Sequence, residues 1–279
     1  MSEKTIDCGG RPLDLGHPRV MAILNVTPDS FSDGGAYDSI EAAVDRALAM
    51  VGEGAAIIDV GGESTRPGAQ AVGVQQEIDR VVPVIEALAH ATTVPISIDT
   101  SKPEVMRAAV AAGAGFINDV RALRDPGALE AAVELAVPVC LMHMQGEPRS
   151  MQRRPDYHDC VGEVRTFLEA RLHTCRGAGI PQARLLIDPG FGFGKTLQHN
   201  LELLRHLADL KDLGVPLMVG MSRKAMIGQI LDRPVGERLY GSITLAVLAV
   251  WQGAALVRVH DIRATIEAVR VCHAVMQAR

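Results

Sequence analysis

Two cationic side chains, Arg258 and His260, lie two positions apart in the apolar segment LVRVHD. Residues two apart on a β-strand point to the same side, so both can contact one anion. A planar guanidinium donates hydrogen bonds in pairs, which suits phosphate oxygens. A lone arginine is usually a solvated surface residue, but Arg258 is flanked by Val257 and Val259. The pattern therefore predicts an anion site where this segment ends.

Two further residues extend the predicted anion site. Asn25 ends the first apolar segment of the chain, and Arg66 lies in the long loop after the second. Mg²⁺ bound with a phosphate prefers hard oxygen ligands, and Asn25 and Asp33 are the candidates for this expected cofactor. The sequence has no cysteine and histidine cluster with zinc-ligand spacing. It also lacks the GxSxG motif of a serine nucleophile.

A second polar group consists of Asp99, Asn118 and Asp188, which end the third, fourth and sixth apolar segments. Burying a carboxylate is costly unless it is paired or hydrogen-bonded. Three such side chains suit a flat heterocycle with amino and ring N–H donors along one edge. Helix capping is the alternative for Asp99 and for Asp188, which precedes Pro189. For the helix after Asp99, Ser101 is the expected N-cap.

The glycine-rich segment GFGFGKT, residues 190–196, is similar to a phosphate-binding loop but differs from it in spacing. It is one residue short of GxxxxGK[ST], and it does not fit GxGxxG. We interpret it as a flexible loop that places Phe193 over a planar ligand. Lys224, in the strand-to-helix turn GMSRK, is expected to contact an anion or a ligand carbonyl or ring nitrogen. His143 ends the fifth apolar segment and fits a structural or a ligand-binding role equally.

Eight apolar segments position these residues, and helical patterns separate them. The segments lack polar alternation, which is typical of parallel strands buried on both faces, and parallel strands need such crossover helices. The 279 residues therefore predict one (β/α)8 TIM barrel domain, 1–279, with its active site at the C-terminal ends of the strands. An open doubly wound sheet is the alternative, but TPDSFS follows the first strand instead of GxGxxG. The predicted strands are 20–25, 56–60, 95–99, 115–119, 138–143, 184–188, 216–220 and 255–260. The predicted helices are 40–53, 75–91, 102–112, 125–136, 162–176, 197–211, 237–252 and 262–276.

Composition argues against several classes of partner. The net charge is −5 and aromatic residues make up 3% of the chain, which disfavours a nucleic-acid binder. The longest apolar stretch, 243–257, is shorter than the ~20 residues of a membrane span. No secretory signal is recognisable, and none of the five cysteines forms a CxxC pair. We therefore expect a cytoplasmic protein.

The motifs along the chain resemble those of the bacterial dihydropteroate synthases, in register from about residue 15 to residue 274. Two of them differ from the family pattern by one residue each, with IDPGFGFGK for LDPGFGFGK and VRVHD for IRVHD. Taken together, the motifs of the first two loops and the FGFGK motif are highly specific. The matching segments are NVTPDSFSDGG, DVGGESTRPGA, SIDTSKPEV, INDVRAL, LMHMQG, IDPGFGFGK, VGMSRKAMIG and VRVHD.

The resemblance implies a barrel that is usually a homodimer and that acts in folate biosynthesis. Members condense 6-hydroxymethyl-7,8-dihydropterin pyrophosphate with p-aminobenzoate, giving 7,8-dihydropteroate and pyrophosphate by a dissociative substitution at the pterin methylene. Sulfonamides imitate p-aminobenzoate in this family and are expected inhibitors here. The resemblance gives His143 no role.

Roles carry over by position. The catalytic set is Asp99, Asp188, Lys224, Arg258 and His260. The pterin-binding set is Asp99, Asn118, Asp188, Lys224, Met142, Phe193 and Gly220. The pyrophosphate-binding set is Asn25, Arg66, Arg258 and His260, with Asn25 and Asp33 on Mg²⁺. The p-aminobenzoate-binding set is Thr65, Pro67, Phe193, Ser222, Lys224, Phe31 and Pro28.

Two other functions fit part of this pattern. A pterin-binding methyltransferase domain shares the barrel and the Asp/Asn set, but it needs neither diphosphate ligands nor the SRK turn. A non-catalytic paralogue would bind pterin without turnover. The presence of Asn25, Asp33 and Arg66 in or beside the two long loops disfavours that reading.

Overall fold

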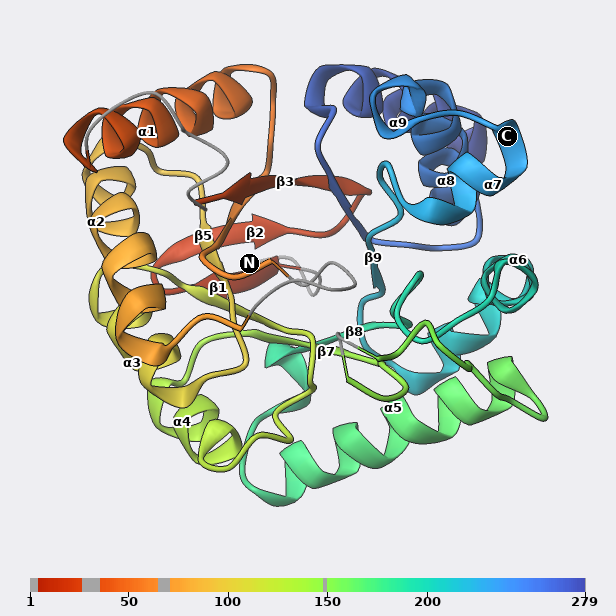
Figure 1. The fold of residues 1–279 in the computed structure, drawn as a ribbon, viewed down its shortest axis with the longest axis horizontal. Helices are drawn as coiled ribbons and strands as arrows, with labels where there is room; N and C mark the ends of the chain where they lie inside the picture. The colour runs from red at the N-terminus through yellow and green to blue at the C-terminus, as the bar shows by residue number, and fades with distance from the viewer. Residues whose placement is uncertain (1–4, 27–35, 65–70, 148–149, 279) are drawn as a thin grey trace.

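A ring of parallel strands forms the centre of the molecule (Figure 1). The computed structural model describes residues 5–26, 36–64, 71–147 and 150–278. Within these ranges the sheet has eight strands in the order β8-β7-β6-β5-β4-β3-β10-β9. A parallel bridge between Ile187 and Leu217 joins β8 to β9 and closes the ring. The strands are β3 (Arg19–Asn25), β4 (Ile57–Gly61), β5 (Ile96–Asp99), β6 (Phe116–Asp119), β7 (Val139–Met142), β8 (Leu185–Asp188), β9 (Met218–Val219) and β10 (Leu256–Val259).

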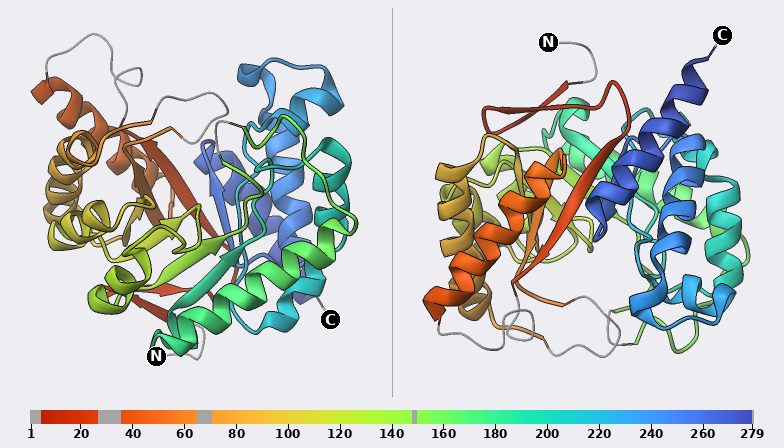
Figure 2. Two further views of the ribbon diagram at one scale, coloured as in Figure 1. Left: turned by 60° about the horizontal axis from the view of Figure 1, so that its bottom comes forward. Right: turned by 90° about the horizontal axis from the view of Figure 1, so that it is seen from above.

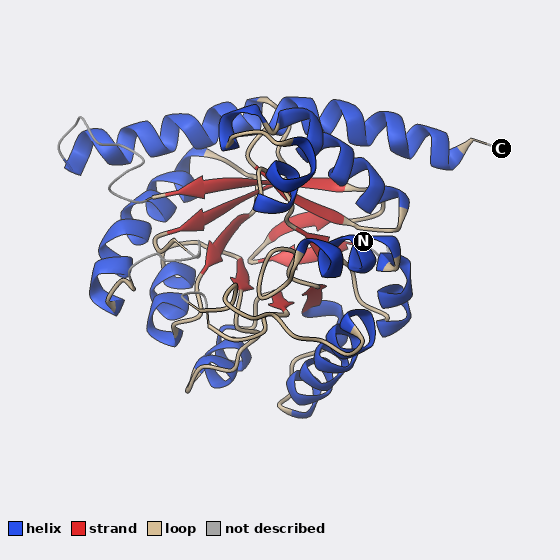
Figure 3. Ribbon diagram, turned by 45° about the vertical axis from the view of Figure 1, so that its right-hand side comes forward, coloured by secondary structure: helices blue, strands red, loops and turns tan. Residues whose placement is uncertain are grey.

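Helices cover the outside of the ring (Figure 3). Neighbouring strands follow one another in chain order around the barrel, so the sheet has no point where the order reverses. The TIM barrel prediction is therefore confirmed, and the open doubly wound alternative is wrong. The helices are α1 (Ala36–Gly52), α2 (Val74–Ala91), α3 (Pro103–Ala111), α4 (Ala128–Leu135), α5 (Cys160–Gly177), α6 (Leu197–Arg205), α7 (Ala225–Leu231), α8 (Leu239–Trp251) and α9 (Ile262–Gln277).

An antiparallel hairpin precedes the barrel and was not predicted. Its strands are β1 (Thr5–Cys8) and β2 (Arg11–Asp14). Its buried side chains pack against the first inward layer of the barrel, and Figure 2 shows the hairpin at the end where the strands begin. Burying each Leu-sized side chain contributes about 1.5–3 kcal/mol. The hairpin therefore closes the end of the barrel opposite the expected active site. The cluster comprises Ile6, Cys8, Leu13, Leu15, Met21, Ile57, Phe116, Cys140, Leu186, Met218 and Leu256.

Strand register separates an apolar layer inside the barrel from a polar one. Successive inward side chains on a strand are two residues apart. On β4, Ile57 lies in the apolar layer and the next inward side chain is Asp59. Asp59 is in register with Ser97 of β5, and Asp99 is in register with Asn118 of β6. The polar residues therefore face one another in the half of the barrel nearer the strand ends.

Two local predictions need correction. Ser101 is not the N-cap of α3, because the cap is Lys102 without a side-chain hydrogen bond, and Pro103 occupies the first turn as expected. The Ser101 hydroxyl instead donates to the Asp119 carboxylate. The predicted helix 197–211 is α6 followed by a separate 3₁₀ helix, Leu207–Leu213, and α7 was not predicted. No helix in the described part of the chain is long and apolar enough to span a membrane.

Candidate active site

Arg258 lies at the centre of the polar layer, between two carboxylates. Its Nε donates to Asp59 Oδ2 at 2.5 Å, and its Nη2 donates to Asp99 Oδ2 at 2.7 Å. Asn118 Nδ2 donates to the same Asp59 oxygen at 3.0 Å. Arg258 of the predicted cation group therefore pairs with Asp99 of the predicted acidic group, and it shares Asp59 with Asn118.

Burial and charge act in opposite directions on this network. Burial raises the pKa of Asp99 to about 7, although the Arg258 guanidinium acts against the shift. Burial lowers the pKa of Arg258, but the charges of Asp59 and Asp99 outweigh it and the net shift is upward. Asp99 is a β5 strand-end residue and does not cap α3. The capping alternative for Asp99 is therefore wrong.

Asp59 is a site residue that the sequence analysis missed. It is fully buried within the apolar segment IIDVG. The desolvation argument used for Asp99 applies equally to a carboxylate inside such a strand, so the signal was present. Among the described residues, neither Asp59 Oδ1 nor the neighbouring Ser97 Oγ has a hydrogen-bond partner. Two buried oxygen atoms without a hydrogen-bond partner thus lie in or next to the network that Arg258 forms with Asp59 and Asp99.

Asp188 ends β8 on the other side of the polar layer and is 4% exposed. Its Oδ1 accepts a hydrogen bond from the Gly190 backbone N–H at 2.7 Å, so one oxygen does serve the local turn. Burial raises the pKa of Asp188, and Lys224 opposes this shift. The positive charges of Lys224, Lys195 and Arg258 all act on this carboxylate.

Lys224 connects Asp188 with the glycine-rich loop. Its Nζ donates to the Phe191 carbonyl and lies 4.4 Å from the centre of the Phe193 ring, a cation–π contact. Burial lowers the pKa of Lys224 to about 8, although Asp188 acts in the opposite direction. Met142, at the end of β7, packs in one cluster with Phe193. The Phe193 ring, the Lys224 ammonium group and the Asp188 carboxylate therefore lie close together in the site.

The glycine-rich loop is not a phosphate cradle. Its Gly190 N–H is used by Asp188, its Gly192 N–H donates to Asn200 Oδ1 at 2.7 Å, and its Phe193 N–H donates to Gly190 O at 3.1 Å. A phosphate loop needs such N–H groups free to face the anion. The structure therefore agrees with the sequence prediction that residues 190–196 do not form a phosphate-binding P-loop.

The turn after β9 places Ser222 against His260. Ser222 Oγ accepts from the His260 backbone N–H at 3.2 Å and lies 3.0 Å from His260 Nδ1. Between Ser222 and Lys224, Arg223 has a left-handed backbone with φ 58° and pairs with Asp261. The ion pair with Asp261 stabilises the strained backbone of Arg223. It therefore also fixes the positions of Ser222 and Lys224 relative to β10.

Asn25 and Asp99 both lie beside Gly61. A Cβ added to Gly61 would lie 3.8 Å from Asn25 Oδ1 and from Asp99 Oδ2, which is ordinary van der Waals contact. Within the described ranges, no group of three His, Cys, Asp or Glu residues could hold a metal ion. A cation here would rely on few protein oxygens and on its ligand, which is the usual way Mg²⁺ binds with phosphates.

Several predicted residues lie outside the described residues. They belong to the loops after β3 and β4. They are Pro28, Phe31, Asp33, Thr65, Arg66 and Pro67. The described set Asn25, Asp99, Asn118, Met142, Asp188, Phe193, Gly220, Ser222, Lys224, Arg258 and His260 comes from strand ends and the turns after them.

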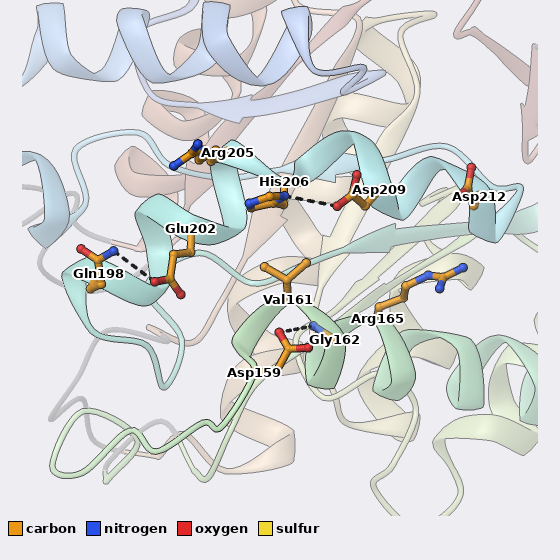
Figure 4. A pocket seen from close by; sticks show the side chains of 10 residues that line it. All are labelled: Asp159, Val161, Gly162, Arg165, Gln198, Glu202, Arg205, His206, Asp209 and Asp212. Atoms are coloured by element: carbon orange, nitrogen blue, oxygen red, sulfur yellow. Dashed lines mark hydrogen bonds and ion pairs between the residues drawn. The ribbon is translucent and has the colours of Figure 1, made fainter.

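A groove lies between α5, α6 and the 3₁₀ helix Leu207–Leu213 (Figure 4). Two pairs of its polar side chains contact one another: Gln198 donates to Glu202 at 3.1 Å, and His206 lies 3.4 Å from Asp209. None of the predicted site residues lines it. The groove is therefore not the site that the sequence motifs describe.

Comparisons with known proteins point to one family. Residues 21–260 match the pterin binding enzyme family. A dihydropteroate synthase of Escherichia coli K12 is 56% identical over 270 residues, which cover 97% of this chain and 96% of that protein. The dihydropteroate synthase of Xanthomonas albilineans, solved with 4-aminobenzoic acid, is 54% identical with a TM-score of 0.94 and 99% coverage of both chains. The Yersinia pestis enzyme, solved as a sulfonamide drug complex, is 50% identical with a TM-score of 0.93, covering 99% of this chain and 100% of that one.

Proposed function

This chain belongs to the dihydropteroate synthases, a family of pterin binding enzymes, and from that premise we propose how its strand ends divide the reaction. The enzyme transfers a pterin group to form 7,8-dihydropteroate, the reaction of folate biosynthesis that the sequence resemblance implies. The observation that carries the proposal is the polar layer at the strand ends. There, carboxylates and cations that are costly to bury gather in one place.

The acidic side of the layer binds the pterin in this proposal. Asp99, Asn118 and Asp188 supply oxygen acceptors to a ring edge rich in N–H donors, and Lys224 supplies a donor for its acceptor atoms. Burial strengthens these hydrogen bonds, because the local dielectric is low. Met142 and Phe193 supply apolar surface for the flat ring, and Gly220, beside Arg258, leaves space.

The cationic side binds the diphosphate. Arg258 and His260 lie on β10 and its following turn, and Arg66 and Asn25 join them by their place in the family motifs. Arg258 is already charged and held by Asp59 and Asp99, so it needs little reorganisation to stabilise negative charge. Asn25 and Asp33 would hold Mg²⁺. When bound, this ion neutralises charge on the diphosphate oxygens.

The proposed chemistry is a dissociative substitution at the pterin methylene. The bond from the methylene carbon to the diphosphate oxygen breaks, and the electron pair leaves with pyrophosphate. The neutral arylamine nitrogen then forms a bond to the methylene carbon and loses its proton afterwards. Asp99 and Asp188 stabilise the cationic pterin, while Arg258 and His260 stabilise the departing group.

The p-aminobenzoate site lies over the turn after β9. Lys224 contacts the Phe193 ring there, and Ser222 lies in the same turn as Lys224. Thr65, Pro67, Pro28 and Phe31 join them by their place in the family motifs. The Xanthomonas relative was solved with 4-aminobenzoic acid, and the Yersinia relative with a sulfonamide drug. We expect both classes of ligand to compete for this site.

The direct test is the release of pyrophosphate by the purified protein. We expect release together with dihydropteroate formation when the pterin substrate, p-aminobenzoate and Mg²⁺ are all present. A pterin-binding methyltransferase or a non-catalytic paralogue would form no dihydropteroate under these conditions. Absence of product with a folded protein would therefore contradict the proposal.

We further propose that the protein is a cytoplasmic homodimer, with α8 and α9 forming the contact between subunits. These helices pack against each other (Figure 1). Tyr240, Leu248 and Trp251 of α8 are 80%, 46% and 57% exposed, and Val271 and Val275 of α9 are 66% and 56% exposed. Exposed apolar surface of this kind is typical of subunit contacts. The five cysteines are free, which suits a reducing compartment.

A further inference from the structure

Lys195 and His143 form a buried pair that the proposed chemistry does not use. Lys195 is 3% exposed and His143 is 6% exposed. Lys195 Nζ lies 2.8 Å from His143 Nδ1, 3.0 Å from Gly190 O and 3.2 Å from Phe193 O. An ammonium group has three donors, so these three acceptors satisfy all of them. A buried charge is tolerated only under such conditions, which indicates that Lys195 has a defined task.

Lys195 holds both ends of the turn 190–193. The turn is closed by the hydrogen bond from Phe193 N to Gly190 O, and Lys195 donates to the carbonyls of the same two residues. The remaining carbonyls of the loop accept from other side chains: Tyr157 Oη donates to Gly194 O at 2.9 Å, and Lys224 donates to Phe191 O. The loop therefore has a fixed backbone that depends on side-chain donors.

The loop also lies directly on the segment that carries His143. Gly190 has φ +71°, and a Cβ there would come within 1.8 Å of His143 O. Gly194 has φ +62°, and a Cβ there would come within 2.4 Å of Gln145 O. Only glycine permits such close approach at positive φ. The glycines of the motif thus bring the loop onto the backbone after β7.

Contacts with neighbouring residues hold both the ring and the backbone of His143 in place. It makes an edge contact with the Phe167 ring at 4.9 Å, and the backbone N–H of His143 donates to Asp188 O at 2.9 Å. An ammonium group has no acceptor atom, so below the pKa of Lys195, which burial lowers to about 7, Lys195 donates to His143 Nδ1 and the His143 ring proton lies on Nε2. His143 thereby orients Lys195 and connects the loop to β7 and β8.

We propose that Lys195 and His143 are positioning residues, which fix the turn 190–193 so that Phe193 and the Phe191 carbonyl hold Lys224 in the active site. This inference rests on the proposed function. It gives His143 the role that the sequence left open, and it explains why a lysine follows the glycines in FGFGK. Neither residue contacts the substrate in this proposal.

Steady-state kinetics of Lys195→Met and His143→Phe test the role. Lys195→Met keeps a side chain of similar length but removes the donor, and His143→Phe keeps an aromatic ring but removes the acceptor. Losing a buried charged hydrogen bond should raise KM for p-aminobenzoate roughly tenfold or more, with a smaller change in kcat. His143→Asn, which keeps an acceptor oxygen, should recover part of the loss. The matched control Lys211→Met removes an exposed lysine and should behave as wild type.

A second measurement does not depend on activity. Two-bond ¹⁵N–¹H correlation spectra of the ligand-free protein, recorded below the Lys195 pKa of about 7, should show the Nε2–H tautomer at His143. Finding Nδ1 protonated would overturn the inference even if the enzyme is active. Wild-type KM and kcat in folded Lys195→Met would also overturn it. A wild-type protein that forms no dihydropteroate would instead contradict the proposed function.

Discussion

At the scale of single residues, the main feature is that Arg258 serves two groups at once. Its ion pairs with Asp59 and Asp99 keep a charged guanidinium inside the barrel in the ligand-free protein. A diphosphate that approaches the strand ends meets a cation whose position is already set. Such preorganised charge is the most effective form of electrostatic catalysis. The roles of individual residues remain predictions that substitutions can test.

Arg258→Ala should lower the rate of pyrophosphate release roughly 100- to 1000-fold, the usual effect of removing one preorganised donor. It should also destabilise the protein by about 3–5 kcal/mol, because two buried carboxylates lose their partner. Initial rates and urea unfolding measure the two effects. The double variant with Asp59→Asn should regain stability but not activity. Unchanged rates in Arg258→Ala would contradict the diphosphate assignment.

The pH dependence of the reaction should reflect Asp99. Its pKa is raised to about 7 by burial, so the carboxylate that we propose accepts the pterin N–H is lost as the pH falls through this value. We expect kcat/KM for the pterin substrate to decrease below about pH 7, since this parameter reports the free enzyme. Asp99→Asn should be less active and should lack this decrease. The same acid limb in both proteins would assign it to another group.

At the scale of elements, the hairpin that stabilises the barrel and the polar layer of the proposed site lie toward opposite ends of the strands. The hairpin β1-β2 closes the end where strands begin, and the polar layer lies toward the other end. Residues that only stabilise the barrel should therefore be separable from residues that act on the substrate. This separation is common among TIM barrels, whose active sites lie at the C-terminal ends of the strands.

Leu13→Ala tests the separation. Leu13 is 2% exposed in the hairpin, and its truncation should lower the free energy of unfolding by about 2–5 kcal/mol. Well below the unfolding transition, kcat and both KM values should stay at wild-type levels. Chemical denaturation and steady-state assays measure the two quantities. A large change in KM without loss of stability would show that the hairpin acts on the active site.

The sequence analysis predicted the repeated strands of the barrel but missed the hairpin and α7, which lie outside that repeat. All eight barrel strands were identified, because parallel strands are continuous apolar segments followed by polar residues. The hairpin was missed since its strands, TIDC and RPLD, mix polar and apolar residues and are not continuous apolar segments, and α7 was missed since it has only seven residues. Asp59 was missed because it lies inside a strand rather than at its end. The pairing of Lys195 with His143 joins residues 52 positions apart, which no local pattern reveals.

At the scale of the whole molecule, the polar layer that we propose carries the chemistry lies toward one end of the barrel, and the outer helices α8 and α9 carry exposed apolar side chains. The exposed residues of α8 and α9 lie on the outer ring, on elements other than those that supply the polar layer. An oligomeric contact there would leave the strand ends accessible to substrate. Dimer formation and catalysis should therefore be separable.

Val271→Glu should weaken the proposed dimer by placing a charge in its apolar contact. Sedimentation equilibrium should give twice the 29.8 kDa chain mass for wild type and a lower mass for the variant. Glu267→Gln, on the same helix, is the control and should not change the mass. A wild-type protein that sediments as a single chain at micromolar concentration would contradict the dimer.

The central claim is that the pterin binds inside the ring of strand ends, and calorimetry with the pterin substrate tests it most directly. Asp188→Asn keeps the hydrogen bond to Gly190 but exchanges the ligand-facing acceptor for a donor. We predict that this variant binds at least tenfold more weakly than wild type, as expected when a charged hydrogen bond is lost. Glu202→Gln, in the groove between α5 and α6, should bind like wild type. Wild-type affinity in Asp188→Asn, or weakened binding in Glu202→Gln alone, would contradict the account.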